Sequence, residues 1–513
     1  MKNEGRVKPI LDPARISTST DDSARSPISQ IRWNSRALLL VFLIFGSYYR
    51  WTVHPHVTAE VPEHGVYNFL TDAYLQGQLS LLITPDPRLL QLNDPYDPKQ
   101  NSTIDHPQDL SFYKGKYYVY YGPAAALTLF LPFRVLFGIS LPDRIAVWLF
   151  GTAAFIAACL FLKTAVARFC PRTLRFIFYG LCYALGFSNL FPSVLRRPGF
   201  YETAITSGQC FLLWGLYLLL RACLDEKRST LSLALGGASL GMAILARPSL
   251  VFGGLALVWT FLLNDGLRFK EKRKRFLIAA APFAAALVLV GIHNYLRFDS
   301  PLDFGIRYQL AGINSSKVQF FSAGRLLGNI FLFLLYPPKI SGTFPYLGLF
   351  LPSLKPASNY LWFEPIAGLL WLSPLCLELL LIPMLVIGKQ NGVAKRGLLA
   401  LIGVLSLIGA VLLLLDASLM ATMRYLADFA SLFFIAAAVT GLRATEMVSS
   451  PVLRRVAIGI IASLTVMAIL ICFPIGLVSQ YDSLKNSAPG QFETLEKLSR
   501  PVGTFLRAIG VPK

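Results

Sequence analysis

The hydrophobic positions of this 513-residue chain fall into long apolar runs that are separated by shorter polar segments. We interpret eleven of these runs as helices that cross a bilayer, whose hydrocarbon core takes about 20 residues of helix. The runs are residues 37–53, 143–162, 174–190, 203–220, 231–246, 249–263, 276–293, 366–388, 397–415, 425–442 and 456–476. The pattern therefore predicts an all-α polytopic membrane protein.

Two further apolar runs, residues 123–138 and 326–336, are too short to cross a bilayer. The first also contains Pro132 and Arg134, and counting it as a span would reverse the side of every later loop. We interpret both runs as short juxtamembrane helices that lie on or dip into the outer leaflet. Apolar packing between loops is the alternative interpretation.

The distribution of Lys and Arg among the loops predicts the orientation of the chain in the membrane. The formal net charge is +20, 54% of residues are hydrophobic and the mean hydropathy is +0.54. One set of alternate loops holds 26 of the 48 Lys and Arg residues, and cytoplasmic loops are enriched in these residues. We therefore predict a cytoplasmic disordered tail (1–36), a transmembrane body (37–476) with outer loops 54–142 and 294–365, and a short outer C-terminal tail (477–513).

Composition also excludes several classes of protein. The basic residues are dispersed between apolar spans instead of gathered on one face, so no nucleic acid partner is expected. The seven cysteines lie in or beside apolar runs without paired spacing, so packing explains them and no disulfide framework is implied. The polar N-terminus lacks the early apolar segment of a cleaved secretory signal.

The first outer loop is net acidic and rich in tyrosine, in contrast to the rest of the chain. It begins with a predicted short helix over 67–77 that places Asp72 on a mostly apolar face, with Gly77 near its end. Asp72 is a candidate general base, and a solvated surface carboxylate is the alternative. Asp94, Asp97 and Asp109 are weaker candidates because Asp is common in turns and caps.

Cations also occur at the predicted outer ends of the spans, against the positive-inside bias. They are Arg196, Arg197, Arg247, Arg297 and Arg424. A converging set of cations suits an anion that resides there, such as a lipid phosphate or diphosphate. We expect these arginines to act through that phosphate more than through fold stability. The alternative is that each arginine side chain separately places its charged group at the membrane interface, without a shared ligand.

Metal binding has only weak support in the sequence. His54 and His56 form a His-x-His pair, and His64 follows eight residues later. No second cluster with strict ligand spacing follows, so no metal site is assigned, although a divalent cation stays possible.

The order of the polar motifs resembles that of the GT-C class of membrane glycosyltransferases, which includes protein O-mannosyltransferases and lipid A aminoarabinose transferases. The motifs are residues 72–79 (DAYLQGQL), 113–123 (YKGKYYVYYGP), 245–248 (LARP), 294–305 (NYLRFDSPLDFG) and 423–425 (MRY). The resemblance covers about residues 37–476 and is to uncharacterised bacterial members more than to the named enzymes.

The resemblance implies that Asp72 is the catalytic residue, which deprotonates or orients an acceptor hydroxyl. It also implies a polyprenyl-phosphate-linked sugar donor whose phosphate is cradled by Lys114, Lys116, Arg247 and Arg424. The sequence departs from the class at Ala73, where a second acid is common. A lone carboxylate is a poor site for a divalent cation, so metal dependence is not implied.

We therefore expect a hexosyl or pentosyl transferase in a bacterial inner membrane, with its active site on the periplasmic face, membrane lipids around it, and a glycan, lipid or protein acceptor. The predicted substrate-binding residues are polar or aromatic side chains of the outer loops and outer helix ends: Asp109, Tyr113, Lys114, Lys116, Tyr121, Arg197, Glu202, Arg247, Arg297, Tyr308, Arg424 and Tyr425. The alternatives are a transporter or flippase of an anionic or lipid-linked substrate, and a lipid-linked glycan polymerase or ligase.

Overall fold

The computed structural model describes residues 35–53, 65–188, 191–225, 229–263, 266–352, 364–388, 393–479 and 483–512. Within them, eight helices are long and apolar enough to cross a membrane. They are α5 (Asp143–Phe169), α6 (Arg175–Ser188) continued by α7 (Phe191–Leu195), α8 (Phe200–Leu224), α9 (Ser229–Ala246), α11 (Phe269–Phe298), α15 (Val393–Leu419), α16 (Ala430–Met447) and α17 (Pro451–Val478). The chain is an integral multi-pass membrane protein, and the predicted all-α fold class is confirmed.

The other three predicted spans are also helical but are not among these eight, and two of them are divided into short helical segments. They are α1 (Ser35–Val53), η6 (Pro248–Val258) with α10 (Trp259–Leu262), and α13 (Leu369–Leu372) followed by η8 (Pro374–Leu381) and α14 (Ile382–Ile387). Because a 3-10 helix rises about 2.0 Å per residue against about 1.5 Å for an α-helix, η6 and α10 together reach roughly 28 Å. Tight winding thus gives this short segment nearly the length of a span.

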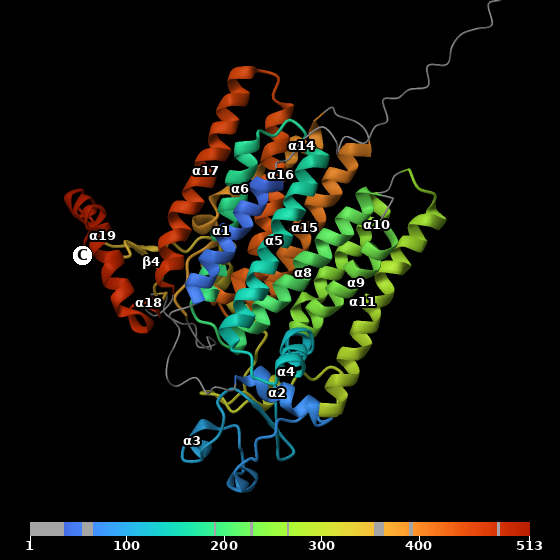
Figure 1. Cartoon of the computed structure of the whole chain (residues 1–513), viewed down its shortest axis with the longest axis vertical. Helices are drawn as coiled ribbons and strands as arrows, with labels where there is room; N and C mark the ends of the chain where they lie inside the picture. The colour runs from blue at the N-terminus through green and yellow to red at the C-terminus, as the bar shows by residue number, and fades with distance from the viewer. Residues whose placement is uncertain are drawn as a thin grey trace, which may run out of the picture.

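Helix α8 lies between α5 and α9, and α9 packs in turn against α11 (Figure 1). Small residues allow the close approach: a Cβ at Gly237 of α9 would lie 1.8 Å from the carbonyl oxygen of Ala279 in α11. Gly215 and Gly236 face the α8–α9 contact in the same way. Close backbone approach at small residues is a common way of packing helices in lipid, where there is no hydrophobic drive between helices.

The remaining long helices complete the bundle. Helix α16 packs against α15 and η8, α17 packs against α6, and α1 packs against α5. The segment η9 (Met423–Asp428) joins α15 to α16 and contacts α8. It brings Arg424 and Tyr425 next to the first turns of α8.

The described part of the predicted first outer loop, residues 65–142, folds over one end of the bundle (Figure 1). Its elements are α2 (Val66–Leu75), η3 (Pro87–Gln91), α3 (Pro98–Asn101), the hairpin of β1 (Ser111–Tyr113) and β2 (Lys116–Tyr118), the π-helical turn η4 (Ala126–Phe130) and α4 (Leu131–Phe137). The predicted helix around Asp72 is α2, and Gly77 follows it with a φ of +72°. The run 123–138 forms a short helix that cannot cross a bilayer, as expected.

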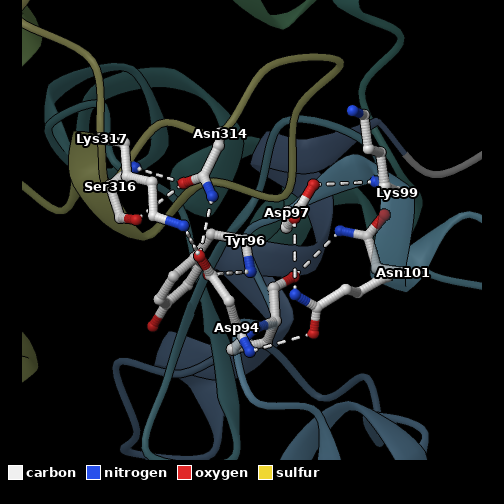
Figure 2. Close-up of polar contacts among 10 residues, drawn as sticks. Asp94, Tyr96, Asp97, Lys99, Asn101, Asn314, Ser316 and Lys317 are labelled. Atoms are coloured by element: carbon white, nitrogen blue, oxygen red, sulfur yellow. Dashed lines mark hydrogen bonds and ion pairs between the residues drawn. The ribbon is translucent and has the colours of Figure 1, made fainter.

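The second outer loop contains η7 (Ile306–Tyr308), α12 (Ala323–Leu334) and the two-residue strands β3 (Lys339–Ile340) and β4 (Leu347–Gly348). Several contacts join it to the first loop, among them a backbone bridge and an ion pair. Ser111 of β1 forms an antiparallel bridge with Gln309, and the Asp94 carboxylate accepts hydrogen bonds from Asn314 Nδ2 and Lys317 Nζ, each at 2.8 Å (Figure 2). The two outer loops thus form one layer.

The C-terminal segment is more structured than the short tail predicted. It forms α18 (Ser483–Ser487) and the 20-residue α19 (Pro489–Ala508), which stands apart from the bundle beside α17 (Figure 1). The Tyr346 hydroxyl donates to the Ser499 carbonyl at 2.7 Å, and Arg507 donates to the Gly342 carbonyl at 2.9 Å. These bonds hold α19 against the β3–β4 hairpin.

Candidate functional site

Helix α2 is fixed at three points, so its side chains have defined positions. The Asn68 side chain exchanges two hydrogen bonds with the backbone of Leu141, at 2.8 and 3.1 Å. The ring of Tyr67 stacks on Phe130 with centroids 5.5 Å apart, and Tyr74 Oη lies 3.3 Å from His293 Nε2 of α11. The helix that carries Asp72 is therefore anchored to η4, to the start of α5 and to α11.

Asp72 forms an ion pair with Arg134 of α4. Asp72 Oδ1 accepts hydrogen bonds from Arg134 Nη2 at 2.6 Å and from Nε at 3.1 Å. The Asp72 side chain is 29% exposed and the Arg134 side chain is 20% exposed. A ligand can therefore reach the pair from the surface of the protein. Sequence reasoning did not single out Arg134 as a site residue, although a lone arginine in an apolar run is itself a signal of function.

Helix α4 presents a strongly apolar surface next to this pair. Val135, Leu136 and Phe137 are 66%, 75% and 63% exposed, and α4 buries none of its residues. In a chain that spans a membrane, such a surface is suited to contact with lipid. A carboxylate, a guanidinium and a lipid-facing helix therefore meet at one place.

A second, deeper group centres on Arg247, at the end of α9. Its guanidinium binds the Asp428 carboxylate at 2.9 and 3.0 Å and lies over the Tyr425 ring, 5.3 Å from the centroid. Arg247 is 7% exposed and Asp428 is fully buried. Asp416, at the end of α15, is 1% exposed and interacts electrostatically with both partners.

Arg424 is the other cation of the deeper group. Its Nη2 lies 2.8 Å from Glu364 Oε1, and its Nη1 lies 3.7 Å from Glu202 Oε1. Burial alone would lower the pKa of Arg424, but the charges of Glu364 and Glu202 raise it. Arg247 and Arg424 thus each already have a carboxylate partner, and a donor phosphate would have to compete with it.

Aromatic rings connect the outer loop to this deeper group. The Tyr121 ring lies 5.8 Å from that of Tyr201 in α8, and the Arg424 guanidinium lies over the Tyr201 ring at 4.7 Å. Tyr201 Oη donates to Asp109 Oδ2 at 2.6 Å. The chain reaches this depth because Gly122 passes close to α9: a Cβ there would lie 1.8 Å from the Leu245 carbonyl oxygen.

The β1–β2 hairpin forms a third, exposed group. Tyr113 Oη and Lys114 Nζ both donate to Asp299 Oδ2, at 2.8 and 2.6 Å. The ammonium group of Lys114 lowers the pKa of Asp299, and the Tyr113 ring packs against Tyr308 at 4.6 Å. Lys116 is exposed on the same hairpin.

Arg297 of α11 has a different environment. Its guanidinium donates to the carbonyl oxygen of Val119 and, at 2.8 Å, to Asn294 Oδ1, and the residue is 4% exposed. These contacts tie α11 to the chain that follows β2, which is a positioning role. Arg197 precedes α8 and donates its backbone N–H to the Val194 carbonyl at 3.2 Å.

The structure therefore brings Tyr121, Glu202, Arg247, Arg424 and Tyr425 together and links Asp109 to them through Tyr201. It places Asp72 with Arg134, and Tyr113, Lys114 and Tyr308 with Asp299. Sequence reasoning missed three acids, Asp299, Glu364 and Asp428. Each of them lies far along the chain from the cation with which it pairs.

In the part of the chain that the structure describes, no three His, Cys, Asp or Glu side chains are arranged to hold a metal ion. The His-x-His pair of His54 and His56, and His64, lie outside the described residues. All seven cysteines are free and buried.

No family model and no curated protein sequence matches this chain. Among solved structures, the chain is similar to ArnT from Cupriavidus metallidurans bound to undecaprenyl phosphate, at 11% identity and a TM-score of 0.43, over 90% of this chain and 79% of that one. It is also similar to the oligosaccharyltransferase of Archaeoglobus fulgidus tethered with an acceptor peptide, at 10% identity and a TM-score of 0.42, over 91% of this chain and 59% of that one. The apo form of that protein gives 12% identity and a TM-score of 0.35. Both proteins are glycosyltransferases of the GT-C class that the sequence resembles, and the likeness is distant.

Proposed function

We propose that the chain is a membrane glycosyltransferase that moves a sugar from a polyprenyl-phosphate donor to a hydroxyl acceptor on the outer face of a bacterial inner membrane. The observation that carries this proposal is the partly exposed Asp72–Arg134 pair beside the apolar surface of α4. A lipid-linked sugar that reaches the site along α4 would meet Arg134 with its phosphate and Asp72 with its sugar.

The reaction requires a base and a group that stabilises the leaving phosphate. Asp72 takes the proton of the acceptor hydroxyl while the hydroxyl oxygen bonds to the anomeric carbon. The bond from that carbon to the phosphate oxygen breaks, its electron pair stays on the polyprenyl phosphate, and configuration is inverted. Arg134 neutralises the phosphate through charge-assisted hydrogen bonds.

The ion pair has a switching role in this scheme. Without donor, Arg134 Nη2 lies 2.6 Å from Asp72 Oδ1, and the Asp72 carboxylate is occupied by this ion pair. A donor phosphate competes for the guanidinium, and Asp72 is then released toward the acceptor. Lys114, Arg247 and Arg424, which the resemblance assigns to the phosphate, pair with carboxylates in this structure, as Arg134 does. We assign the phosphate to Arg134 because it is the cation of this group that lies in α4, beside the exposed apolar side chains of that helix.

The test is donor consumption by the purified full-length protein with a panel of polyprenyl-phosphate-linked sugars, comparing the wild type with Arg134→Gln. We expect Arg134→Gln to weaken donor binding by about 10- to 100-fold, which corresponds to the roughly 1.5–3 kcal/mol of a hydrogen bond to a charged group. The matched control is Arg88→Gln, which breaks the exposed Arg88–Asp86 pair of the same loop.

Donor binding that is equal in the wild type and Arg134→Gln would contradict the role of Arg134. Donor that binds to the wild type and is never consumed with glycan, lipid or protein acceptors would contradict the transferase and favour a transporter or flippase.

A further inference from the structure

A hollow with a volume of about 220 Å³ lies among the ends of four helices, at the opposite end of the bundle from α2 and α4. Its polar lining comes from Arg168 in the last turn of α5, Lys395 in the first turn of α15 and Arg443 near the end of α16. This is the end where the Lys- and Arg-rich loops predict the cytoplasmic side. The hollow is therefore separate from the Asp72 site.

The charge around this hollow is unbalanced. Arg443 pairs with Glu446 at 3.0 Å, but neither Arg168 nor Lys395 has a carboxylate partner among the described residues. Lys395 Nζ is held by the carbonyl oxygens of Val386 and Gly388, both at 2.7 Å, and Arg168 lies over the Phe169 ring at 5.8 Å. Cations from three helices thus surround this space, and two of them, Arg168 and Lys395, have no carboxylate partner in the described part of the chain.

The rest of the wall is apolar and includes Phe169, Leu385 and Met447. Leu385 belongs to α14, where Ile387 is 81% exposed and Val386 is 51% exposed. The volume is below the roughly 300–1,000 Å³ of pockets for drug-sized ligands, so the hollow admits a headgroup and not a whole lipid. The acyl chain of such a lipid would lie outside the hollow, along the exposed apolar side chains of α14.

We propose that this hollow binds the phosphate headgroup of an anionic membrane lipid in the leaflet at the Lys- and Arg-rich end. Arg168 and Lys395 hold the phosphate, and the acyl chain lies against α14. A phosphodiester carries one negative charge, which the two unpaired cations more than balance.

The test is native mass spectrometry of the full-length protein in detergent, with short-chain phosphatidylglycerol as the probe. We expect the double variant Arg168→Gln/Lys395→Gln to bind it at least 10-fold more weakly than the wild type. Arg168→Gln alone is also measured, because the Arg168 side chain makes no hydrogen bond to another described residue whose loss would weaken the fold. It should show a several-fold loss. The control is Arg175→Gln, which removes an exposed cation at the same end and should change nothing.

Two competitors separate the possible sources of the phosphate. Short-chain phosphatidylcholine, whose headgroup is neutral overall, should bind several-fold more weakly than phosphatidylglycerol. Equal binding of the two lipids, or equal binding by the wild type and the double variant, would overturn the proposal. Displacement by inorganic phosphate at the same concentration as the lipid would overturn the lipid assignment and leave a soluble phosphate as the ligand. No sugar donor is present, so failure here would leave the proposed transferase reaction untouched.

Discussion

Asp72 and Asp428 each bind one arginine at the same end of the molecule, but they differ in exposure. The Asp72 side chain is 29% exposed, whereas the Asp428 side chain is fully buried. An exposed pair contributes about 0–1 kcal/mol and can open without harm, while a buried charge left alone is costly. Exposure therefore favours a chemical role for Asp72 and a structural role for Asp428.

This contrast changes the expectation for Arg247, which the sequence suggested as a phosphate ligand. Arg247→Ala would leave Asp428 buried and unpaired, which typically costs about 3–5 kcal/mol. We therefore expect a clear loss of thermal stability in detergent, measured by the unfolding of the purified protein. The double variant Arg247→Leu/Asp428→Leu should recover most of that loss. A single variant as stable as the wild type but unable to bind donor would instead support the phosphate role.

The conformation and environment of a single residue were predictable only where the local sequence determines them. The helix around Asp72 and the left-handed Gly77 follow from the local pattern. The partner of Asp72 does not, because Arg134 is 62 positions later and meets it only after η4 and α4 fold back. Arg247 and Asp428 are 181 positions apart and meet for the same reason.

At the scale of elements, the outer layer depends on contacts between two loops that are far apart in sequence. The ammonium group of Lys317 lowers the pKa of Asp94, with a smaller contribution from Asn314. A lowered pKa in the folded protein means that this contact stabilises the layer above the ordinary Asp pKa of about 3.9. The stabilisation is lost as the pH falls through the lowered value.

We expect Lys317→Gln to increase hydrogen exchange several-fold in residues 93–101 and 310–317 at neutral pH. The wild type should approach the same protection, corrected for intrinsic exchange, only below the ordinary Asp pKa of about 3.9, as the pH falls through the lowered pKa of Asp94. Lys99→Gln, on the same loop without an ion pair among the described residues, is the control. Equal protection in the wild type and Lys317→Gln at neutral pH would show that the contact does not hold the loops together.

All eleven predicted spans coincide with helices because length and hydropathy are properties of the local sequence. Their winding was not predicted, since η6 and η8 are as apolar as their α-helical neighbours and hydropathy does not distinguish 3-10 from α winding. The 20-residue helix α19 was not predicted either, since the C-terminal segment was expected only as a short tail.

At the scale of the whole molecule, the bundle has two chemically different ends. The end with α2 and α4 gathers acids that pair with arginines, while at the opposite end Arg168 and Lys395 have no carboxylate partner in the part of the chain that the structure describes. Some carboxylates depart from this division, among them Glu446, which pairs with Arg443 at the opposite end, and Glu378 in η8, which is 7% exposed within an apolar helix. A transporter would place more such groups along the spans, so this distribution favours chemistry at one interface.

The predicted orientation can be tested directly by cysteine labelling. Lys99 and Lys270 are both exposed, at opposite ends of the bundle, and the seven native cysteines are buried. In intact cells, an impermeant reagent should label Lys99→Cys and not Lys270→Cys. The reverse pattern would place the Asp72 site on the cytoplasmic side.

The central claim is that Asp72 is the general base, and the most direct measurement compares donor binding and donor turnover in the wild type and Asp72→Asn. Asparagine is nearly isosteric and can still accept a hydrogen bond from Arg134, but it cannot take the acceptor's proton. We expect turnover to fall by about 10²- to 10⁴-fold while donor affinity and thermal stability stay close to the wild type. Turnover near the wild-type rate with normal donor binding would contradict the claim, and so would a loss of binding and stability together.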